Sequence, residues 1–173
     1  DMHTGDLDAA DAWYREKAPR EPTHLNVMRR YQYLTQAMVE LEDGRPDTVQ
    51  LPLAPLEPYV QNCARIIDGI HLNVLTAIAL YRKKDERWRE RLTAALDAAA
   101  EYRFIRTVSV YGTAVLPLLE VLDWDGDKAW RKRLMAAVRT QAAFYTQFLE
   151  PRLAPGEELT PTELQILHLL CAD

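Results

Sequence analysis

Apolar residues recur at helical spacing along most of this chain. Between residues 23 and 42 they stand three or four positions apart, at Leu25, Met28, Tyr31, Leu34, Met38 and Leu41. The same spacing returns in residues 64–82, 85–102 and 128–148, whereas β-branched residues form no alternating runs. Such stripes are buried when helices pack face to face, so the pattern predicts an all-α protein.

Prolines and glycines predict where the helices end, because a proline inside a helix costs about 3 kcal/mol. The expected helices cover 6–17, 23–42, two short pieces within 45–63, then 64–82 and 85–102 as an antiparallel pair. Residues 103–122 should divide near Gly112, and Asp125-Gly126-Asp127 should form a turn. The last long helix, 128–148, would bury one side formed by Trp130, Leu134, Ala137, Val138, Gln141, Phe144, Tyr145 and Phe148.

A faint internal repeat suggests how these helices are arranged. The segments 34–38 and 75–79 occupy corresponding places in successive helix pairs, which Gly44 and Lys84 close. The spacing of about 41 residues exceeds the 34 of a regular tetratricopeptide repeat. We therefore expect a tetratricopeptide-like right-handed array of antiparallel helix pairs, with a plain helical bundle as the alternative.

Composition excludes several classes of function. The formal net charge is −5 and the pI is near 5.4, which opposes binding of a phosphate backbone by this stretch alone. Cys63 and Cys171 have neither metal-ligand spacing nor a disulfide framework, as expected in a reducing cytosol. No apolar run approaches the roughly eighteen residues of a membrane span. We expect a cytoplasmic protein without a membrane partner.

No pattern of catalytic or metal-binding residues is present. The histidines (His3, His24, His71 and His168) form no ligand pair, and Asp123, Asp125 and Asp127 lack the twelfth-position carboxylate of a calcium loop. There is no Ser-His-Asp order, no nucleophile elbow and no glycine-rich phosphate loop. The sequence therefore predicts no enzyme, no metal and no cofactor.

Residues 102–111 hold the best candidates for ligand binding. Arg103, Arg106 and Tyr111 stand close to further aromatic residues and could provide polar contacts in an aromatic groove. The alternative is that the two arginines are structural ion-pair partners. The basic residues between 82 and 91 are interrupted by three acids, which is typical of a solvated face.

Residues 159–173 carry the signature of a capped helix. Thr160 and Glu163 can form a capping box, Pro161 stands at the first helical position, and Ile166, Leu167 and Leu170 continue an apolar stripe. The order Leu-Thr-x-x-Glu-x-x-Ile-Leu-x-Leu-Leu resembles the start of the helix-turn-helix of LuxR-type transcription regulators. Thr162 and Gln165 stand where that family usually has Arg and Glu. The alternative is an ordinary terminal helix.

The preceding region resembles the corresponding part of MalT-like regulators, the large ATP-dependent members of that family. The resemblance rests on the order of short motifs at 9–13, 41–45, 92–99, 104–106 and 118–119, followed by the helix start at Leu159. Lys84 stands where the family usually has Gly. The resemblance implies an inducer-sensing superhelix between an ATP-binding module and a DNA-binding module.

These features together predict three parts. Residues 1–150 would be a helical-repeat sensor and scaffold, 151–158 a linker, and 159–173 the first helix of a truncated helix-turn-helix. The expected partners are a small-molecule inducer or a regulatory protein, with DNA bound only through the missing C-terminal domain. The alternative from another class is a helical-repeat adaptor that binds peptides in its concave groove.

Overall fold

The computed structural model describes residues 7–19 and 25–151, and every regular element within these ranges is helical. This confirms the predicted all-α class. The elements in chain order are α1 Leu7–Lys17, the 3₁₀ turn η2 Val27–Arg29, α2 Arg30–Glu42, α3 Gln50–Leu53, α4 Leu56–Asn62, α5 Ile66–Arg82, α6 Trp88–Glu101, α7 Ile105–Ser109, α8 Gly112–Val121 and α9 Lys128–Phe144. In the described part of the chain, no helix has the length and apolar character needed to cross a membrane.

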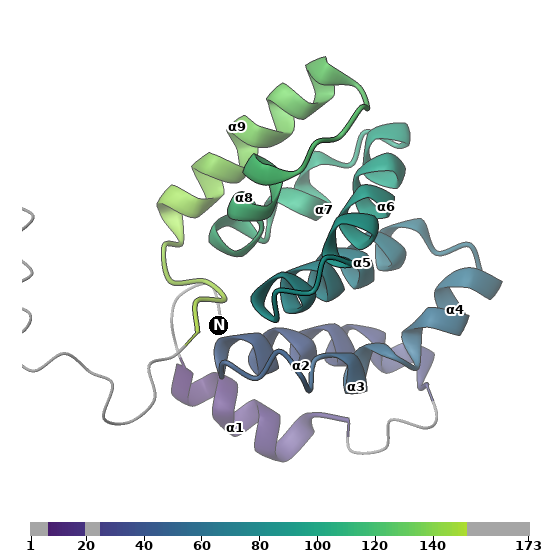
Figure 1. The fold of residues 1–173 in the computed structure, drawn as a ribbon. Coiled ribbons are helices and arrows are strands. Elements are labelled where there is room, and N and C mark those ends of the chain that lie inside the picture. The colour runs from purple at the N-terminus through teal and green to yellow at the C-terminus, as the bar shows by residue number, and fades with distance from the viewer. Residues whose placement is uncertain (1–6, 20–24, 152–173) are drawn as a thin grey trace, which may run out of the picture.

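Helix α5 lies at the centre of the molecule (Figure 1). It packs along α6 as the predicted antiparallel hairpin, and the edge-to-face contact of Tyr81 with Trp88, at 5.3 Å between ring centroids, closes that hairpin. Helices α2, α3 and α4 contact α5 from one side, while α7 and α8 contact it from the other and α9 covers α7 and α8. The tetratricopeptide-like array and its right-handed sense stay predictions.

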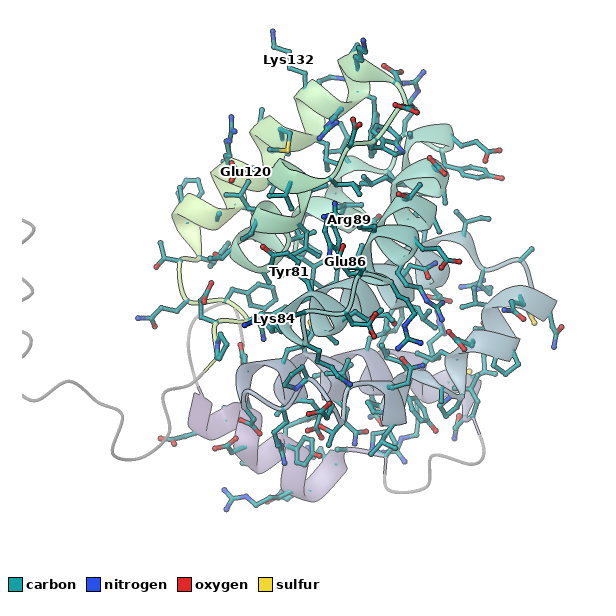
Figure 2. All side chains as sticks on the ribbon, viewed as in Figure 1. Tyr81, Lys84, Glu86, Arg89, Glu120 and Lys132 are labelled. Atoms are coloured by element: carbon teal, nitrogen blue, oxygen red, sulfur yellow. The ribbon has the colours of Figure 1, made fainter. Side chains whose placement is uncertain are left out.

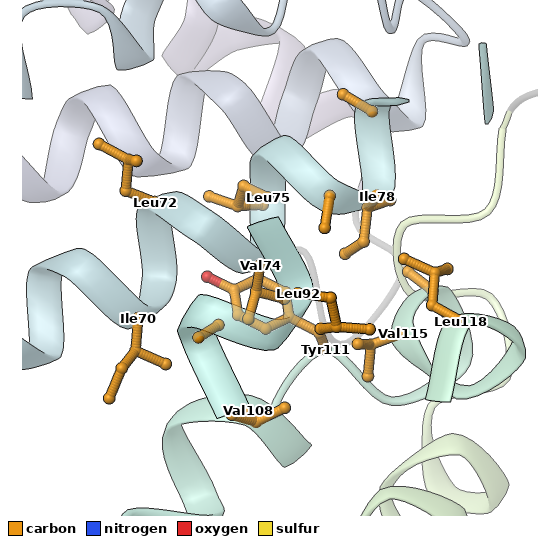
Figure 3. Close-up of a cluster of buried hydrophobic side chains, with 14 of the residues drawn as sticks. Ile70, Leu72, Val74, Leu75, Ile78, Leu92, Val108, Tyr111, Val115 and Leu118 are labelled. Carbon is orange, nitrogen blue, oxygen red and sulfur yellow. The ribbon is translucent and has the colours of Figure 1, made fainter. Parts of the chain in front are cut away.

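The core follows α5 and receives side chains from its neighbours on both sides. Leu75, Ile78, Leu92 and Leu118 are almost completely buried in one continuous cluster (Figure 3). Full burial of such a side chain contributes about 1.5–3 kcal/mol. The cluster therefore fixes the position of α5 relative to α6 and α8.

The breaks between helices fall where the sequence predicts them. Helices α3 and α4 are the two short pieces expected within 45–63, and α4 begins directly after Pro55. The stretch 103–122 divides into α7 and α8 at Gly112, and α8 contains Pro117. Asp127 begins α9 by accepting a hydrogen bond from the backbone N–H of Trp130, at 2.9 Å. This cap explains why α9 starts directly after the predicted turn.

The predicted helix over 23–42 is wrong at its N-terminal end. The Asn26 side chain accepts a hydrogen bond from the backbone N–H of Met28 and starts a 3₁₀ turn, so the α-helix begins only at Arg30. Met28 is consequently 88% exposed and Tyr31 54% exposed. These two residues do not continue the apolar stripe of α2.

The predicted helix over 128–148 is wrong at its C-terminal end. Helix α9 ends at Phe144, which is 76% exposed, and Tyr145 is also exposed. The hydroxyl of Thr113 donates to the carbonyl oxygen of Tyr145 at 3.1 Å, where the backbone leaves the helix. The chain then turns towards α2 and α5, which buries Phe148 and Leu149. Residues 148–150 are called the C-terminal strap below.

Four helices in the described ranges end with a residue in the left-handed backbone region. These residues are Gly44, Ala64, Lys84 and Arg103, with φ between 48° and 67°. In each case the following N–H donates to the carbonyl five residues earlier, as in a Schellman motif. Gly44 and Lys84 thus close α2 and α5 in the same way, and Lys84 adopts the conformation for which glycine is the usual residue.

Candidate ligand-binding cleft

The structure places the three residues predicted from the sequence in different environments. Arg103 is exposed and forms an ion pair with Asp127, with 2.7 Å between Nη1 and Oδ2, which is the structural role considered as its alternative. Arg106 is exposed on α7. Tyr111 is only 2% exposed, and its hydroxyl lies 2.8 Å from Nδ1 of His71. Tyr111 therefore belongs to the core.

Burial keeps this His71–Tyr111 pair uncharged. Desolvation lowers the pKa of His71, although the nearby Asp68 carboxylate acts in the opposite direction. Desolvation also raises the pKa of the Tyr111 phenol far above its usual value. Both rings are therefore neutral at physiological pH and serve the packing of α5 against the start of α8.

The basic residues between 82 and 91 separate into different environments. Lys84 and Arg89 lie on the surface around the turn between α5 and α6 (Figure 2), and Arg89 pairs with Glu86 at 2.8 Å. Arg82 points into the molecule and is half-buried. The remaining three, Lys83, Arg87 and Arg91, line a cleft.

This cleft lies between the segment 46–50, α5 and α6 and has a volume of about 530 Å³. Pockets for small ligands usually measure about 300–1,000 Å³. Its polar lining combines three cations, two carboxylates, two amides and one hydroxyl: Lys83, Arg87, Arg91, Asp47, Glu90, Gln50, Asn73 and Thr76. The cleft is therefore large enough for a polar small molecule.

An ion pair spans the cleft between the segment 46–50 and the end of α5. Lys83 Nζ lies 2.7 Å from Asp47 Oδ1, and both side chains are exposed. An exposed pair of this kind contributes only about 0.2–1 kcal/mol. A ligand with its own charged group can therefore displace it at little cost.

On the other side, Arg91 connects three helices. Its Nη2 lies 2.8 Å from Glu57 Oε1 on α4, and its Nη1 donates to Asn73 Oδ1 on α5 at 3.3 Å. The carbonyl oxygen of the Asn73 amide is thereby occupied, and the amide NH₂ group remains as a donor.

Thr76 is the most buried polar residue of the lining, with 5% exposure. Its hydroxyl has no hydrogen-bond partner among the described residues. An unsatisfied buried hydroxyl destabilises a protein by about 1–3 kcal/mol. The sequence offered a signal for this site, because Asn73 and Thr76 interrupt an otherwise apolar stretch of α5 three positions apart.

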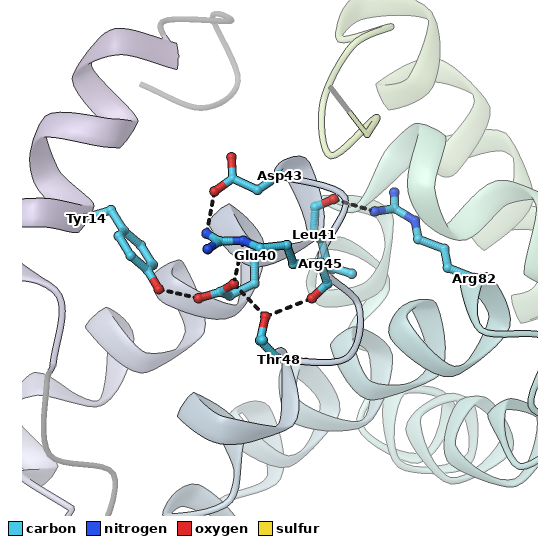
Figure 4. A network of polar contacts seen from close by, with 7 residues as sticks. All are labelled: Tyr14, Glu40, Leu41, Asp43, Arg45, Thr48 and Arg82. Carbon is cyan, nitrogen blue, oxygen red and sulfur yellow. Dashed lines mark hydrogen bonds and ion pairs between the residues drawn. The ribbon is translucent and has the colours of Figure 1, made fainter. Parts of the chain in front are cut away.

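A buried carboxylate holds the wall that carries Asp47 (Figure 4). Glu40 on α2 accepts hydrogen bonds from the hydroxyls of Tyr14 and Thr48, the latter at 2.6 Å, and pairs with Arg45 at 3.1 Å. Burial, followed by the interaction with Glu40, raises the pKa of the Tyr14 phenol. The network attaches α1 and the segment 45–48 to α2, so this wall of the cleft is firmly positioned.

Arg82, next to Lys83, holds the C-terminal strap. Its Nη1 donates to the carbonyl of Leu41 at 2.7 Å, and its Nη2 donates to the carbonyl of Leu149. The backbone N–H of Leu149 in turn donates to the carboxylate of Glu42 at 3.4 Å. At the end of α5, Lys83 thus lines the cleft and the neighbouring Arg82 contacts the strap.

A second cavity, of about 490 Å³, lies between α1, α2 and α3. It is lined mainly by aromatic and aliphatic side chains, among them Tyr14 and Tyr33, and reaches Pro19. Residues 20–24 follow Pro19 and lie outside the described ranges, as do the predicted linker beyond Pro151 and the predicted helix 159–173. Within the described ranges, no group of three His, Cys, Asp or Glu residues is arranged to hold a metal ion.

Comparison with protein-family models, with curated proteins and with solved structures finds no match.

Proposed function

We propose that this chain is the helical sensor and scaffold region of a MalT-like regulator of the LuxR family, acting in the cytoplasm. It binds a small-molecule inducer or a regulatory protein and has no catalytic activity of its own. DNA is bound by the domain that begins at residue 159 and continues beyond Asp173. The order of motifs in the sequence and the all-helical fold support this proposal.

The observation that carries the proposal is the placement of Arg82 and Lys83. Lys83 pairs with Asp47 at the cleft, and Arg82 donates to Leu149 in the strap. A ligand that displaces the Lys83–Asp47 pair changes the contacts at the end of α5. The same helix end holds the strap, which leads directly to the proposed linker 151–158. Binding in the cleft can thereby alter the position of the DNA-binding domain.

The test compares this chain with a protein extended by the residues that follow Asp173. Duplex DNA is first selected for binding from a random-sequence pool, and both proteins are then titrated with it at moderate salt. The extended protein is expected to bind specific sequences, because a helix-turn-helix needs its recognition helix, and the shorter chain is expected not to bind. Absence of specific binding by the extended protein would contradict the proposal and favour the peptide-binding adaptor.

The relay through Arg82 has its own matched variants in the extended protein. Arg82→Gln removes a contact to the strap, whereas Arg89→Gln changes an arginine seven residues later that binds Glu86 and the carbonyl of Val121. Arg82→Gln is expected to change DNA affinity, and Arg89→Gln is expected to leave it unchanged. Equal DNA affinity of both variants would exclude a relay through the strap.

A further inference from the structure

The threonines of the described helices behave differently from one another. Thr35 on α2 and Thr140 on α9 donate their hydroxyls to the carbonyl four residues earlier, at 2.9 and 3.0 Å. This is the usual local bond of a threonine inside a helix. Thr76 on α5 makes no such bond, although it is the most buried of the three. The Thr76 hydroxyl is thus a buried donor without a partner in the described ranges, in a residue that lines the cleft.

The donors of the cleft gather around Thr76. Asn73 lies three residues earlier on α5, which places both residues on the same face of the helix. The oxygen of its side-chain amide accepts from Arg91, and the NH₂ group of the amide is its donor. A hydroxyl, an amide and a guanidinium together form a donor set that suits a carboxylate.

The outer part of the cleft has a mixed charge. Lys83 and Arg87 are accompanied there by the carboxylates of Asp47 and Glu90. A ligand with only negative charge would meet these two carboxylates. A ligand with a carboxylate at one end and a cationic group at the other would complement both parts of the cleft.

We propose that the cleft binds a small zwitterionic carboxylate, of which free amino acids are the simplest members. The carboxylate accepts hydrogen bonds from Thr76 and Asn73 beside the Arg91 guanidinium, and the ammonium group lies near Asp47 and Glu90. The inference rests on the proposed function only in that this ligand would be the inducer.

The test uses calorimetry to measure binding of each free amino acid to the chain. The affinity of each amino acid is compared with that of its carboxyl amide. At least one amino acid is expected to bind, and its amide is expected to bind at least tenfold more weakly, since the amide lacks the negative charge. Thr76→Val keeps the shape of the side chain and removes the hydroxyl. It is expected to weaken binding of that amino acid about tenfold, because one hydrogen bond to a charged group is lost.

Two controls separate loss of the site from loss of the fold. Thr140→Val, on the surface of α9, is expected to leave binding unchanged. Thr76→Val is expected to keep or raise the midpoint of thermal unfolding without ligand, because the hydroxyl has no partner to lose. A lower midpoint together with lost binding would overturn the assigned role of Thr76.

The outcomes also separate the ligand class from the proposed function. Equal binding of amino acids and their amides, or no binding of either at millimolar concentration, would overturn the zwitterionic ligand. The DNA titration of the extended protein requires no ligand, and therefore tests the regulator assignment independently.

Discussion

Most substitutions to glycine destabilise a protein, but a substitution to glycine at the left-handed helix end at Ala64 is expected to stabilise it. Ala64 is exposed, has φ of 48° and separates α4 from α5. A residue with a Cβ atom in this conformation costs about 1–2 kcal/mol. Glycine avoids that cost but loses about 0.5–1 kcal/mol more conformational entropy on folding. Ala64→Gly is therefore expected to stabilise the protein by about 0.5–1 kcal/mol.

The matched control is the same substitution inside a helix. Ala136 is exposed in the middle of α9, where glycine is less favourable than alanine by about 1 kcal/mol. Ala136→Gly should therefore destabilise the protein, so two chemically identical changes should have opposite effects. Lys84→Gly tests the first result at another exposed left-handed position, with φ of 58°.

The assay is urea unfolding followed by far-ultraviolet circular dichroism, with the free energy of unfolding extrapolated to water. Ala64→Gly should move the midpoint to higher urea without changing the slope, and Ala136→Gly should move it to lower urea. If both variants lose stability by the same amount, the helix end at Ala64 is not left-handed in solution. The assignment of a Schellman motif to the helix end at Ala64 would then be wrong.

Three further predictions concern packing and pH. Gly126→Ala should destabilise the protein by about 1–3 kcal/mol in the same assay, because the new Cβ would lie 2.0 Å from the Trp124 ring; an unchanged midpoint would show that the ring moves freely. Leu149→Ala should lower the free energy of unfolding by about 2–5 kcal/mol, whereas Phe144→Ala should change it by less than about 0.5 kcal/mol. Similar losses in both variants would contradict the described end of α9. Burial lowers the pKa of His71 below its ordinary 6.5, so the unfolded chain binds the proton more tightly. The contribution of His71 to the free energy of unfolding should be fully present above about pH 6.5 and should fall as the pH drops below this value. His71→Gln should reduce this pH dependence when unfolding midpoints are compared across that range.

Local patterns were sufficient to predict most of the helices. The apolar spacing in α5 and α6 belongs to each helix alone, and Pro55 stands at the break between α3 and α4. The two wrong helix ends depend on single side chains. Asn26 starts a 3₁₀ turn by capping Met28, and Thr113 binds the carbonyl of Tyr145 from another helix. Periodicity contains no information about such contacts.

The candidate site was not predicted, because its parts come from different helices. Asn73 and Thr76 stand on α5, Arg91 on α6 and Glu57 on α4, and only the packing of these helices brings them together. The residues chosen from the sequence were close to one another along the chain. Tyr111 was among them as an aromatic residue beside arginines, but its apolar neighbours place it in the core.

Arginine side chains also occupy helix C-termini in a way that the sequence does not reveal. Arg82 donates to the carbonyl of Leu41 at the end of α2, and Arg131 donates to the carbonyls of Leu119 and Leu122 at the end of α8. A cation at a helix C-terminus interacts favourably with the helix dipole and with carbonyls that lack helical partners. Part of the positive charge in this acidic chain therefore has a structural role.

The energies of these contacts limit the relay proposed for Arg82. Removing the strap would break a charge-assisted hydrogen bond from Arg82, at about 1.5–3 kcal/mol, and would expose Leu149, at about 1.5–3 kcal/mol more. Coupling between two sites is typically about 1–3 kcal/mol. In the proposed relay, ligand binding in the cleft would therefore be insufficient to release the strap completely. It would be sufficient to exchange the Arg82–Leu149 bond for contact with water while Leu149 stays buried. The proposed signal would then change the direction of the chain after residue 150 rather than detach it.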